Sequence, residues 1–189
     1  GDCYQYLNRQ SSAREYYKKA IEINGEHAEA WYGLGVSYQK ELRYRQAIPF
    51  LEKAINLKQE EEDYWFALAD SHNFLGNESK AIEAYTKTLE LEPSLVEAWV
   101  EYALMHYELN QNDAAIELLK EGIKTNPDAE ELYFLISGMY VEKDLKNEAT
   151  FFLDSGLRLD PDGSTILYEY FPHLENNYWL TNFIENHKS

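Results

Sequence analysis

The chain has 189 residues and carries 34 acidic side chains against 17 basic ones, a formal net charge of −17. This acidity argues against nucleic acid as a partner, because binding to phosphates requires a basic face. No apolar run approaches the roughly 20 residues that a helix needs to span a bilayer, and a single cysteine, Cys3, cannot form an internal disulfide.

The composition supports a soluble chain with a packed core. Hydrophobic residues make up 44% of the chain and 28 residues are aromatic, which is enough apolar surface to exclude a disordered chain. The sequence begins with Gly1 instead of methionine, so we expect the natural N-terminus, with any signal or anchor segment, to lie upstream. The compartment therefore stays open, with a slight preference for the cytoplasm.

Apolar residues recur with helical spacing along the chain, in segments of about 14 residues. Prolines 93, 127 and 161 follow three of these segments and prevent their continuation. Gly76 lies in an expected turn, where a positive φ is easily reached. The expected helices are 11–23, 28–41, 44–58, 62–75, 78–91, 96–109, 112–124, 129–142 and 146–158, then a short one at 164–171 that Pro172 interrupts, and a last one capped by Asn176 or Asn177 and ending near 186.

The sequence repeats with a period of 34 residues. One column of the repeat contains five alanines, and another contains three tryptophans and a tyrosine. A period of this length indicates a stack of similar units, because one helix pair alone cannot bury its apolar face. The two columns are Ala13, Ala47, Ala81, Ala115 and Ala149, and Trp31, Trp65, Trp99 and Tyr133.

The run Trp31-x-x-Leu34-Gly35-x-x-Tyr38, followed by Ala47, resembles the tetratricopeptide repeat, a 34-residue helix–turn–helix unit. This resemblance implies an all-α fold in which antiparallel helix pairs stack into a right-handed α–α superhelix, or solenoid. On this resemblance we expect residues 1–189 to form a single solenoid domain. It would contain a partial repeat at 1–27, full repeats at 28–61, 62–95, 96–129 and 130–163, and irregular capping helices at 164–189.

The segment 164–189 departs from the repeat and is rich in aromatic residues, among them Tyr170, Phe171, Tyr178 and Trp179. Two interpretations stay open. We favour the first, in which the segment covers the apolar end of the fourth full repeat, because an unpaired repeat face demands covering. In the second, part of it forms a homodimer contact or folds into the groove.

No stretch matches the common phosphate, dinucleotide, acyl-transfer or zinc-protease signatures. His72 and His106 share a repeat column with Tyr38 and Tyr140, which suggests either a metal pair or helix-packing side chains. We favour packing, because two histidines without a clear third ligand make a poor zinc site. Cys3 is interpreted as an incidental residue and not as a reactive thiol. We therefore expect no enzyme activity, no cofactor and no metal.

The family resemblance assigns the first helix of each pair to a concave surface, which here is aromatic and acidic. Carboxylates near helix starts stabilise the helix dipole whatever the groove binds, so Asp70, Glu101 and Glu108, which lie farther along, are better candidates for recognition. A solvated acidic face without a partner is the alternative. The concave residues expected to bind a partner are Tyr32, Val36, Asp63, Phe66, Asp70, Phe74, Glu97, Glu101, Leu104, Glu108, Glu131 and Phe134.

One functional subclass of the family fails a test on the residues. Co-chaperone domains of the tetratricopeptide repeat family grip a terminal carboxylate with lysine, arginine and asparagine side chains. None of the matching slots here holds a cation, so a chaperone-tail receptor is not expected. Those slots are Tyr32, Val36, Ala67, Glu97 and Glu101.

The sequence therefore predicts a non-catalytic scaffold that holds a peptide or a partner helix, neutral or basic in charge, in its concave groove. Residues 96–189 carry a net charge of −12, against −5 for residues 1–95, so a basic partner should favour the C-terminal half. Two alternatives remain: a self-associating structural module, and the accessory segment of a larger enzyme or sensor.

Overall fold

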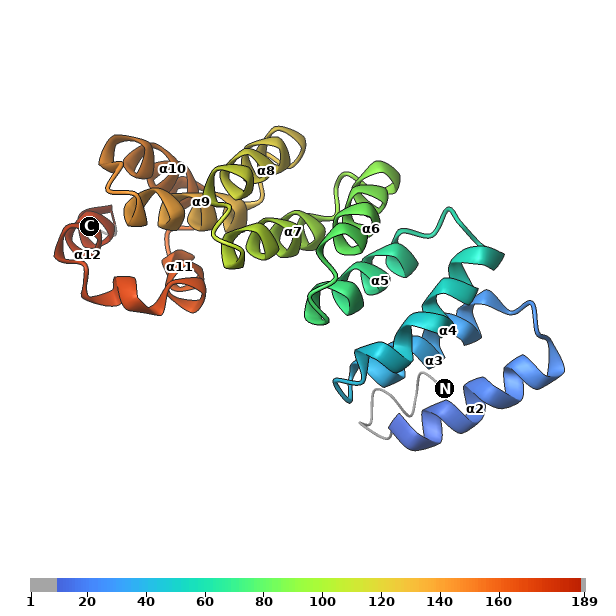
Figure 1. Ribbon diagram of the computed structural model, residues 1–189. Coiled ribbons are helices and arrows are strands. Elements are labelled where there is room, and N and C mark those ends of the chain that lie inside the picture. Colours follow the sequence, from blue (N-terminus) through green and yellow to red (C-terminus); the bar gives the residue numbers. More distant parts are fainter. Residues whose placement is uncertain (1–9, 188–189) are drawn as a thin grey trace. The chain divides into compact units, whose positions relative to one another are not determined.

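The computed structural model describes residues 10–187, with side chains from Ser12 onward, and this part of the chain is helical without strands (Figure 1). The first helices of the pairs are α3 (Ala28–Gln39), α5 (Glu62–Phe74), α7 (Val96–Glu108) and α9 (Glu130–Glu142). The second helices are α2 (Gln10–Ile23), α4 (Tyr44–Leu57), α6 (Glu78–Leu91), α8 (Asn112–Thr125) and α10 (Lys146–Leu159). The C-terminal segment forms α11 (Ser164–Tyr170), the 3-10 helix η1 (Pro172–Asn176) and α12 (Tyr178–His187). The expected all-α fold of helix pairs is confirmed.

The predicted helices begin and end within two residues of their expected positions. The 3-10 helix η1 was not predicted. It exists because Pro172 cannot continue α11 but is well suited to the first position of a new helical turn. Asn177 caps α12 as expected, since its side-chain Oδ1 accepts a hydrogen bond from the amide of Leu180 at 3.2 Å.

The turn within each of the four full repeats passes through one residue in the left-handed region. Gly76 has a φ of 69°, as predicted, and the equivalent turns use Leu42, Asn110 and Asp144, with φ values of 58°, 59° and 55°. These four residues lie 34 apart, so the same backbone turn recurs whatever side chain occupies it. Glycine tolerates this conformation without strain, whereas leucine does not.

The chain divides into two compact units, residues 1–92 (unit 1) and 93–189 (unit 2), which are described separately. In unit 1, helices α2 to α6 pack in sequence, each against the next. Small residues allow close approach: Gly33 lies under the ring of Tyr17, and Gly35 lies against Leu51 of α4. Residues 1–9, which include Cys3, lie outside the described residues.

Unit 2 has one continuous core that includes the C-terminal segment. Leu132, Ile136 and Met139 of α9 are fully buried, and Leu167 and Leu180 of the segment belong to the same cluster. The C-terminal segment therefore packs against α9 of the fourth full repeat and shares its core.

His72 and His106 are packing residues within their own repeats. Both rings are buried. The side-chain amide of Asn77 donates to Nδ1 of His72 at 3.3 Å, and Nδ1 of His106 is hydrogen-bonded to the side chain of Gln111. These bonds tie each histidine to the start of its following helix, which supports the packing interpretation over a metal pair.

Candidate functional site

The predicted partner-binding residues differ widely in their exposure. The most exposed of these residues lie at the ends of α5 and α7, and one residue, Phe134, is inaccessible to a partner. Asp63, Phe74, Glu97 and Glu108 are exposed, Tyr32, Val36, Phe66, Asp70, Glu101, Leu104 and Glu131 are half-buried, and Phe134 is buried.

In unit 1 the candidate residues of α5 form one stripe along the helix. Asp63, Phe66, Asp70 and Phe74 are spaced by three and four residues, which places them on one helix face. Phe74, at the end of this stripe, is 65% exposed. Aromatic side chains, phenylalanine included, are enriched in protein–protein interfaces relative to the rest of the surface.

The exposed ring of Phe74 is held in place by a second aromatic residue. It stacks on Tyr44, the first residue of α4, with ring centroids 4.4 Å apart and planes inclined by 6°. Tyr44 was not among the predicted site residues, although its repeat column offers a signal. It is the aromatic member of a column that otherwise contains Gln10, Glu78, Asn112 and Lys146.

A second stacked pair borders this stripe. Tyr32 of α3 and Tyr64 of α5 have ring centroids 4.7 Å apart. The pKa of Tyr32 is raised well above its ordinary value, first by burial and then by the charges of Asp63 and Asp70. The structure thus brings Asp63 and Asp70 close enough to Tyr32 for their charges to act on its hydroxyl.

Asp70 is fixed in orientation by a hydrogen bond from the core. The hydroxyl of Tyr85, which has no exposed surface, donates to Oδ1 of Asp70 at 2.8 Å. The charge of Asp70 also contributes to raising the pKa of Tyr44, after burial. We define the acidic-aromatic patch as Tyr32, Tyr44, Phe66, Asp70 and Phe74.

In unit 2 four predicted carboxylates share one surface. The pKa of Glu101 is raised above its ordinary value, first by burial and then by the charges of Glu97, Glu108 and Glu131. Repulsion of this kind indicates that the four side chains are near neighbours.

Phe134 does not belong to this surface. Its exposed fraction is 0%, because its ring packs against Gly156 of α10 and Gly163 before α11. The two glycines leave the space that the ring fills. The expectation that Phe134 faces a partner is wrong, since this side chain belongs to the core of unit 2.

The C-terminal segment lies on the predicted inner slots of α9. The hydroxyl of Tyr170 donates to Glu131 at 2.7 Å, the ring of Phe171 packs on Gly138, and Nε2 of His173 lies 2.7 Å from a carboxylate oxygen of Glu142. The segment therefore both covers the fourth repeat and occupies its inner surface, so the two interpretations of the segment overlap.

Tyr107 of α7 meets the C-terminal segment at the same place. Its hydroxyl donates to Glu142 at 2.7 Å, and its ring contacts Phe171 edge-on with centroids 5.4 Å apart. The pKa values of Tyr107 and Tyr170 are both raised, mainly by burial and then by these hydrogen bonds to carboxylates. The sequence contains one signal of this contact. Gly138 is the glycine of a repeat column whose other members, Val36, Asp70 and Leu104, have larger side chains.

Metal-binding and membrane-spanning features are absent from residues 10–187. In this range no three or more side chains of His, Cys, Asp or Glu gather in a way that could hold a metal ion. No helix in the same range is long and apolar enough to cross a membrane.

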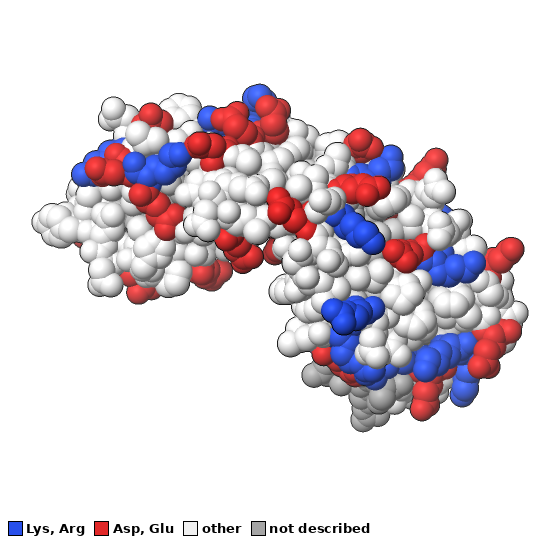
Figure 2. Space-filling view, in the orientation of Figure 1, with Lys and Arg blue, Asp and Glu red and all other residues white. Residues whose placement is uncertain are grey.

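Charge is unevenly divided between the units. Unit 1 carries 11 basic and 16 acidic groups, and unit 2 carries 6 and 18. Figure 2 shows both signs interleaved on the visible face of unit 1. Each unit therefore has a surplus of acidic groups.

Comparison with known proteins identifies the repeat. Models of the tetratricopeptide repeat match residues 1–27, 28–60 and 75–137. A search of the curated proteins found no match.

Several solved structures share the fold. A crystal structure of MamA superposes with a TM-score of 0.75 at 22% identity, over 87% of this chain and 96% of the other. YrrB, described as a TPR protein with an unusual peptide-binding site, gives 0.67 at 22% identity, over 89% and 87%. TTC0263, a thermophilic TPR protein of Thermus thermophilus, gives 0.65 at 17% identity, over 93% and 95%. With its 34-residue period, its helix pairs and these matches, the chain belongs to the tetratricopeptide repeat family.

Proposed function

We propose that the acidic-aromatic patch of unit 1 binds an extended peptide or a helix of a partner protein, neutral or basic in charge. Tetratricopeptide repeats in general form scaffolds for protein–protein interaction, and this general role applies to the chain. We propose that the chain performs no chemistry of its own, so that its function is recognition.

The stacked pair of Tyr44 and Phe74 carries this proposal. Phe74 is 65% exposed although a large ring in water is unfavourable. It also stands in a repeat column whose other members are Lys40, Glu108 and Glu142. The repeat itself does not require an aromatic residue at this position, which favours a role in binding.

The charges of the patch favour a basic group in the partner. Asp70 lies one helical turn from Phe74, and its charge reaches both Tyr32 and Tyr44. A lysine or arginine bound here would gain both from the carboxylate and from the aromatic faces. Hydrophobic contacts with the rings would supply most of the affinity, and the carboxylate would supply selectivity.

The larger negative charge of unit 2 favours it as the site for a basic partner. The inner slots of α9 in unit 2 are covered, however, and this favours unit 1. The predicted inner slots of α9 are in contact with the chain's own Tyr170, Phe171 and His173. A partner would have to displace these residues, of which Phe171 belongs to the core of unit 2 and Tyr170 packs against it. YrrB, with its peptide-binding site, has the same fold and gives general support for peptide recognition.

The proposal can be tested with peptides selected from a randomised library against the wild-type protein. For such a peptide, we expect Phe74→Ala and Asp70→Asn each to weaken the affinity, with Phe74→Ala costing at least about tenfold. Isothermal titration calorimetry measures both. Asp70→Asn should also reduce the salt dependence, because it removes a charge but keeps an oxygen for Tyr85.

Phe151→Ala is the matched control, because Phe151 is also 65% exposed but lies on the second helix α10. If Phe74→Ala and Phe151→Ala change the affinity equally, or if neither Phe74→Ala nor Asp70→Asn changes it, the patch is not the binding site.

Self-association is a second candidate function, and one residue favours it. Tyr178, the first residue of α12, is 82% exposed although most large apolar side chains of the C-terminal segment are covered. A homodimer that uses this ring would dissociate on dilution and would be weakened by Tyr178→Ala. Sedimentation equilibrium measures both effects, and a concentration-independent monomer would exclude this candidate.

A further inference from the structure

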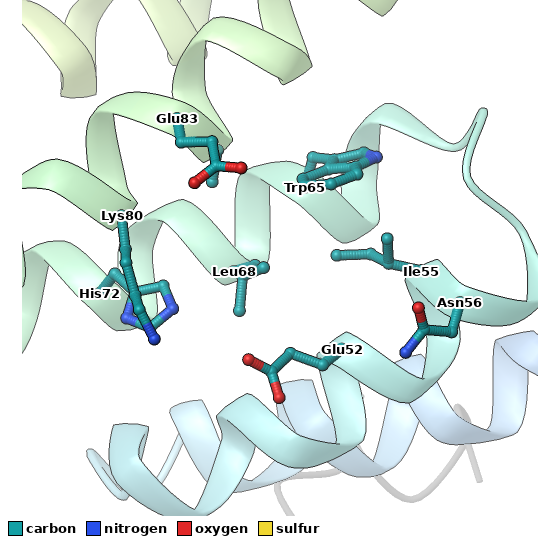
Figure 3. Close-up of a pocket in the computed structure, with 9 residues that line it drawn as sticks. Glu52, Ile55, Asn56, Trp65, Leu68, His72, Lys80 and Glu83 are labelled. Atoms are coloured by element: carbon teal, nitrogen blue, oxygen red, sulfur yellow. The ribbon is translucent and has the colours of Figure 1, made fainter.

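Unit 1 contains a cavity of about 330 Å³ that the proposed function does not use. It lies among α4, α5 and α6, with Trp65, Leu68 and Ala84 among its apolar lining (Figure 3). None of the residues of the acidic-aromatic patch lines this cavity.

The cavity exists because one repeat lacks a large side chain that the others have. The small residue is Ala84 of the second full repeat, whose repeat column contains Phe50, Ala84, Leu118 and Phe152. Phe50 stacks on Tyr38 with centroids 5.4 Å apart and planes inclined by 4°. Phe152 stacks on Tyr140 in the same way, at 5.7 Å and 12°.

The equivalent space in the second full repeat is lined but not filled. Trp65 corresponds to Trp31, and His72 corresponds to Tyr38 and Tyr140. Ala84 provides a single methyl group where the first and fourth repeats provide a ring. The cavity therefore lies where Phe50 and Phe152 place their rings in the other repeats, and it is lined by the same aromatic positions, so it suits one planar group.

Two carboxylates face this space from opposite sides. Glu52 reaches it from α4 and Glu83 from α6, as Figure 3 shows. Neither carboxylate forms an ion pair with any residue between 10 and 187 for which the structure describes side chains. Lys80 lies at the end of the cavity occupied by His72. Burial, and then the charge of Lys80, lower the pKa of His72, which leaves this ring neutral at pH 7.

In the first full repeat, guanidinium groups stack on the residue that corresponds to His72. The guanidinium carbons of Arg14 and Arg43 lie 4.9 and 4.8 Å from the ring centroid of Tyr38, the counterpart of His72. Arg14 is also paired with Glu41 at 2.8 Å. The repeat therefore accommodates a planar cation, stacked on a ring and paired with a carboxylate, on this side of its helix pairs.

We propose that the cavity among α4, α5 and α6 binds the guanidinium group of an arginine on a partner protein. The planar cation replaces the missing ring and lies against Trp65 and His72, and its N–H groups donate to Glu52 and Glu83. The two carboxylates outweigh Lys80, so the cavity selects a cation. Arginine fits better than lysine because only arginine is planar and has several donors in one plane.

Short blocked peptides test the proposal without knowledge of the natural partner. The probe is acetyl-Gly-Arg-Gly-amide, compared with the same peptide carrying lysine, phenylalanine or glutamate at its centre. The indole N–H of Trp65, which donates to the carbonyl of Gln59 at 2.9 Å, reports on binding by NMR. Its signal is assigned with Trp65→Phe.

We expect the arginine peptide to shift the Trp65 signal and to bind at least about tenfold more tightly than the phenylalanine and glutamate peptides. Tighter binding of the phenylalanine peptide, or no shift with the arginine peptide, would overturn the proposal.

Two variants locate the binding event. Ala84→Phe supplies the ring found at the equivalent positions and should reduce binding of the arginine peptide at least about tenfold. The double variant Glu52→Gln, Glu83→Gln keeps the space open and should have a similar effect. Glu60→Gln, an exposed carboxylate of the same unit outside the cavity, is the control and should change nothing. Undiminished binding in a folded double variant would also overturn the proposal.

Discussion

The ring of Phe171 packs so closely on Gly138 that a β-carbon on residue 138 would overlap it. We therefore expect Gly138→Ala to destabilise unit 2 by about 1 to 3 kcal/mol, since either the ring or α9 must shift. Urea unfolding followed by circular dichroism measures the change. Gly25→Ala is the control, because the nearest atom to its added carbon is 3.9 Å away. Equal stability of the two variants would show that the C-terminal segment does not depend on this contact.

The turn residues Leu42 and Gly76 give a pair of predictions with opposite signs. Leu42 has a φ of 58°, which is strained for leucine, and its side chain is exposed. Leu42→Gly should stabilise unit 1 by about 0.5 to 1 kcal/mol, because the strain removed exceeds the added freedom of the unfolded chain.

The reverse substitution in the next repeat, Gly76→Ala, should destabilise by about 1 kcal/mol, although its β-carbon meets nothing within 4 Å. Thermal unfolding of both variants tests the pair, and a stabilising Gly76→Ala would contradict the explanation by backbone strain.

Asp70 has a structural role that can be separated from recognition. Asp70→Ala removes the acceptor of the Tyr85 hydroxyl inside the protein and should cost about 1 to 3 kcal/mol. Asp70→Asn keeps an oxygen at the same place and should cost less. Chemical denaturation of the two variants measures the difference, and a similar loss in both would mean that the charge, and not the hydrogen bond, matters for stability.

Glu101 should make the stability of unit 2 depend on pH. Its pKa in the folded state is raised above the ordinary value of 4.5. Its contribution to stability is therefore complete below pH 4.5 and is lost as the pH rises through the raised pKa. Glu101→Gln, which cannot ionise, should be more stable than wild type at about pH 7, and this advantage should shrink towards about pH 4.

Unfolding curves at several pH values give this difference directly, because groups far from Glu101 titrate alike in both proteins. Glu148→Gln, an exposed carboxylate of α10, should show no comparable trend. A constant difference between Glu101→Gln and wild type across this range would contradict the prediction.

The helices were predictable because their signals are local and repeat every 34 residues. The left-handed turn was predictable at Gly76 but not at Leu42, where the side chain gives no sign of the backbone conformation. Leu42 and Gly76 occupy the same repeat column, so the turn conformation that Gly76 indicates in one repeat is also expected at Leu42 in the preceding repeat. A periodic sequence therefore contains more structural information than any single segment.

The errors in the candidate site come from contacts that the repeat does not encode. Phe134 occupies a slot that the family places on the inner surface, but α10 and the residues before α11 cover it here. Tyr44 was missed because it lies on a second helix, where the family resemblance does not look for partners. Both cases depend on packing between elements, which a one-dimensional pattern does not specify.

The merging of the C-terminal segment with the core of unit 2 limits where the chain can be shortened. A protein ending at Gly163, the end of the fourth full repeat, would lose Leu167, Phe171 and Leu180 from this hydrophobic cluster and leave Gly138 uncovered. Such a fragment should precipitate during purification, whereas one extended to His187 should stay dispersed. Truncation experiments on this protein should therefore follow the hydrophobic cluster and not the repeat boundaries.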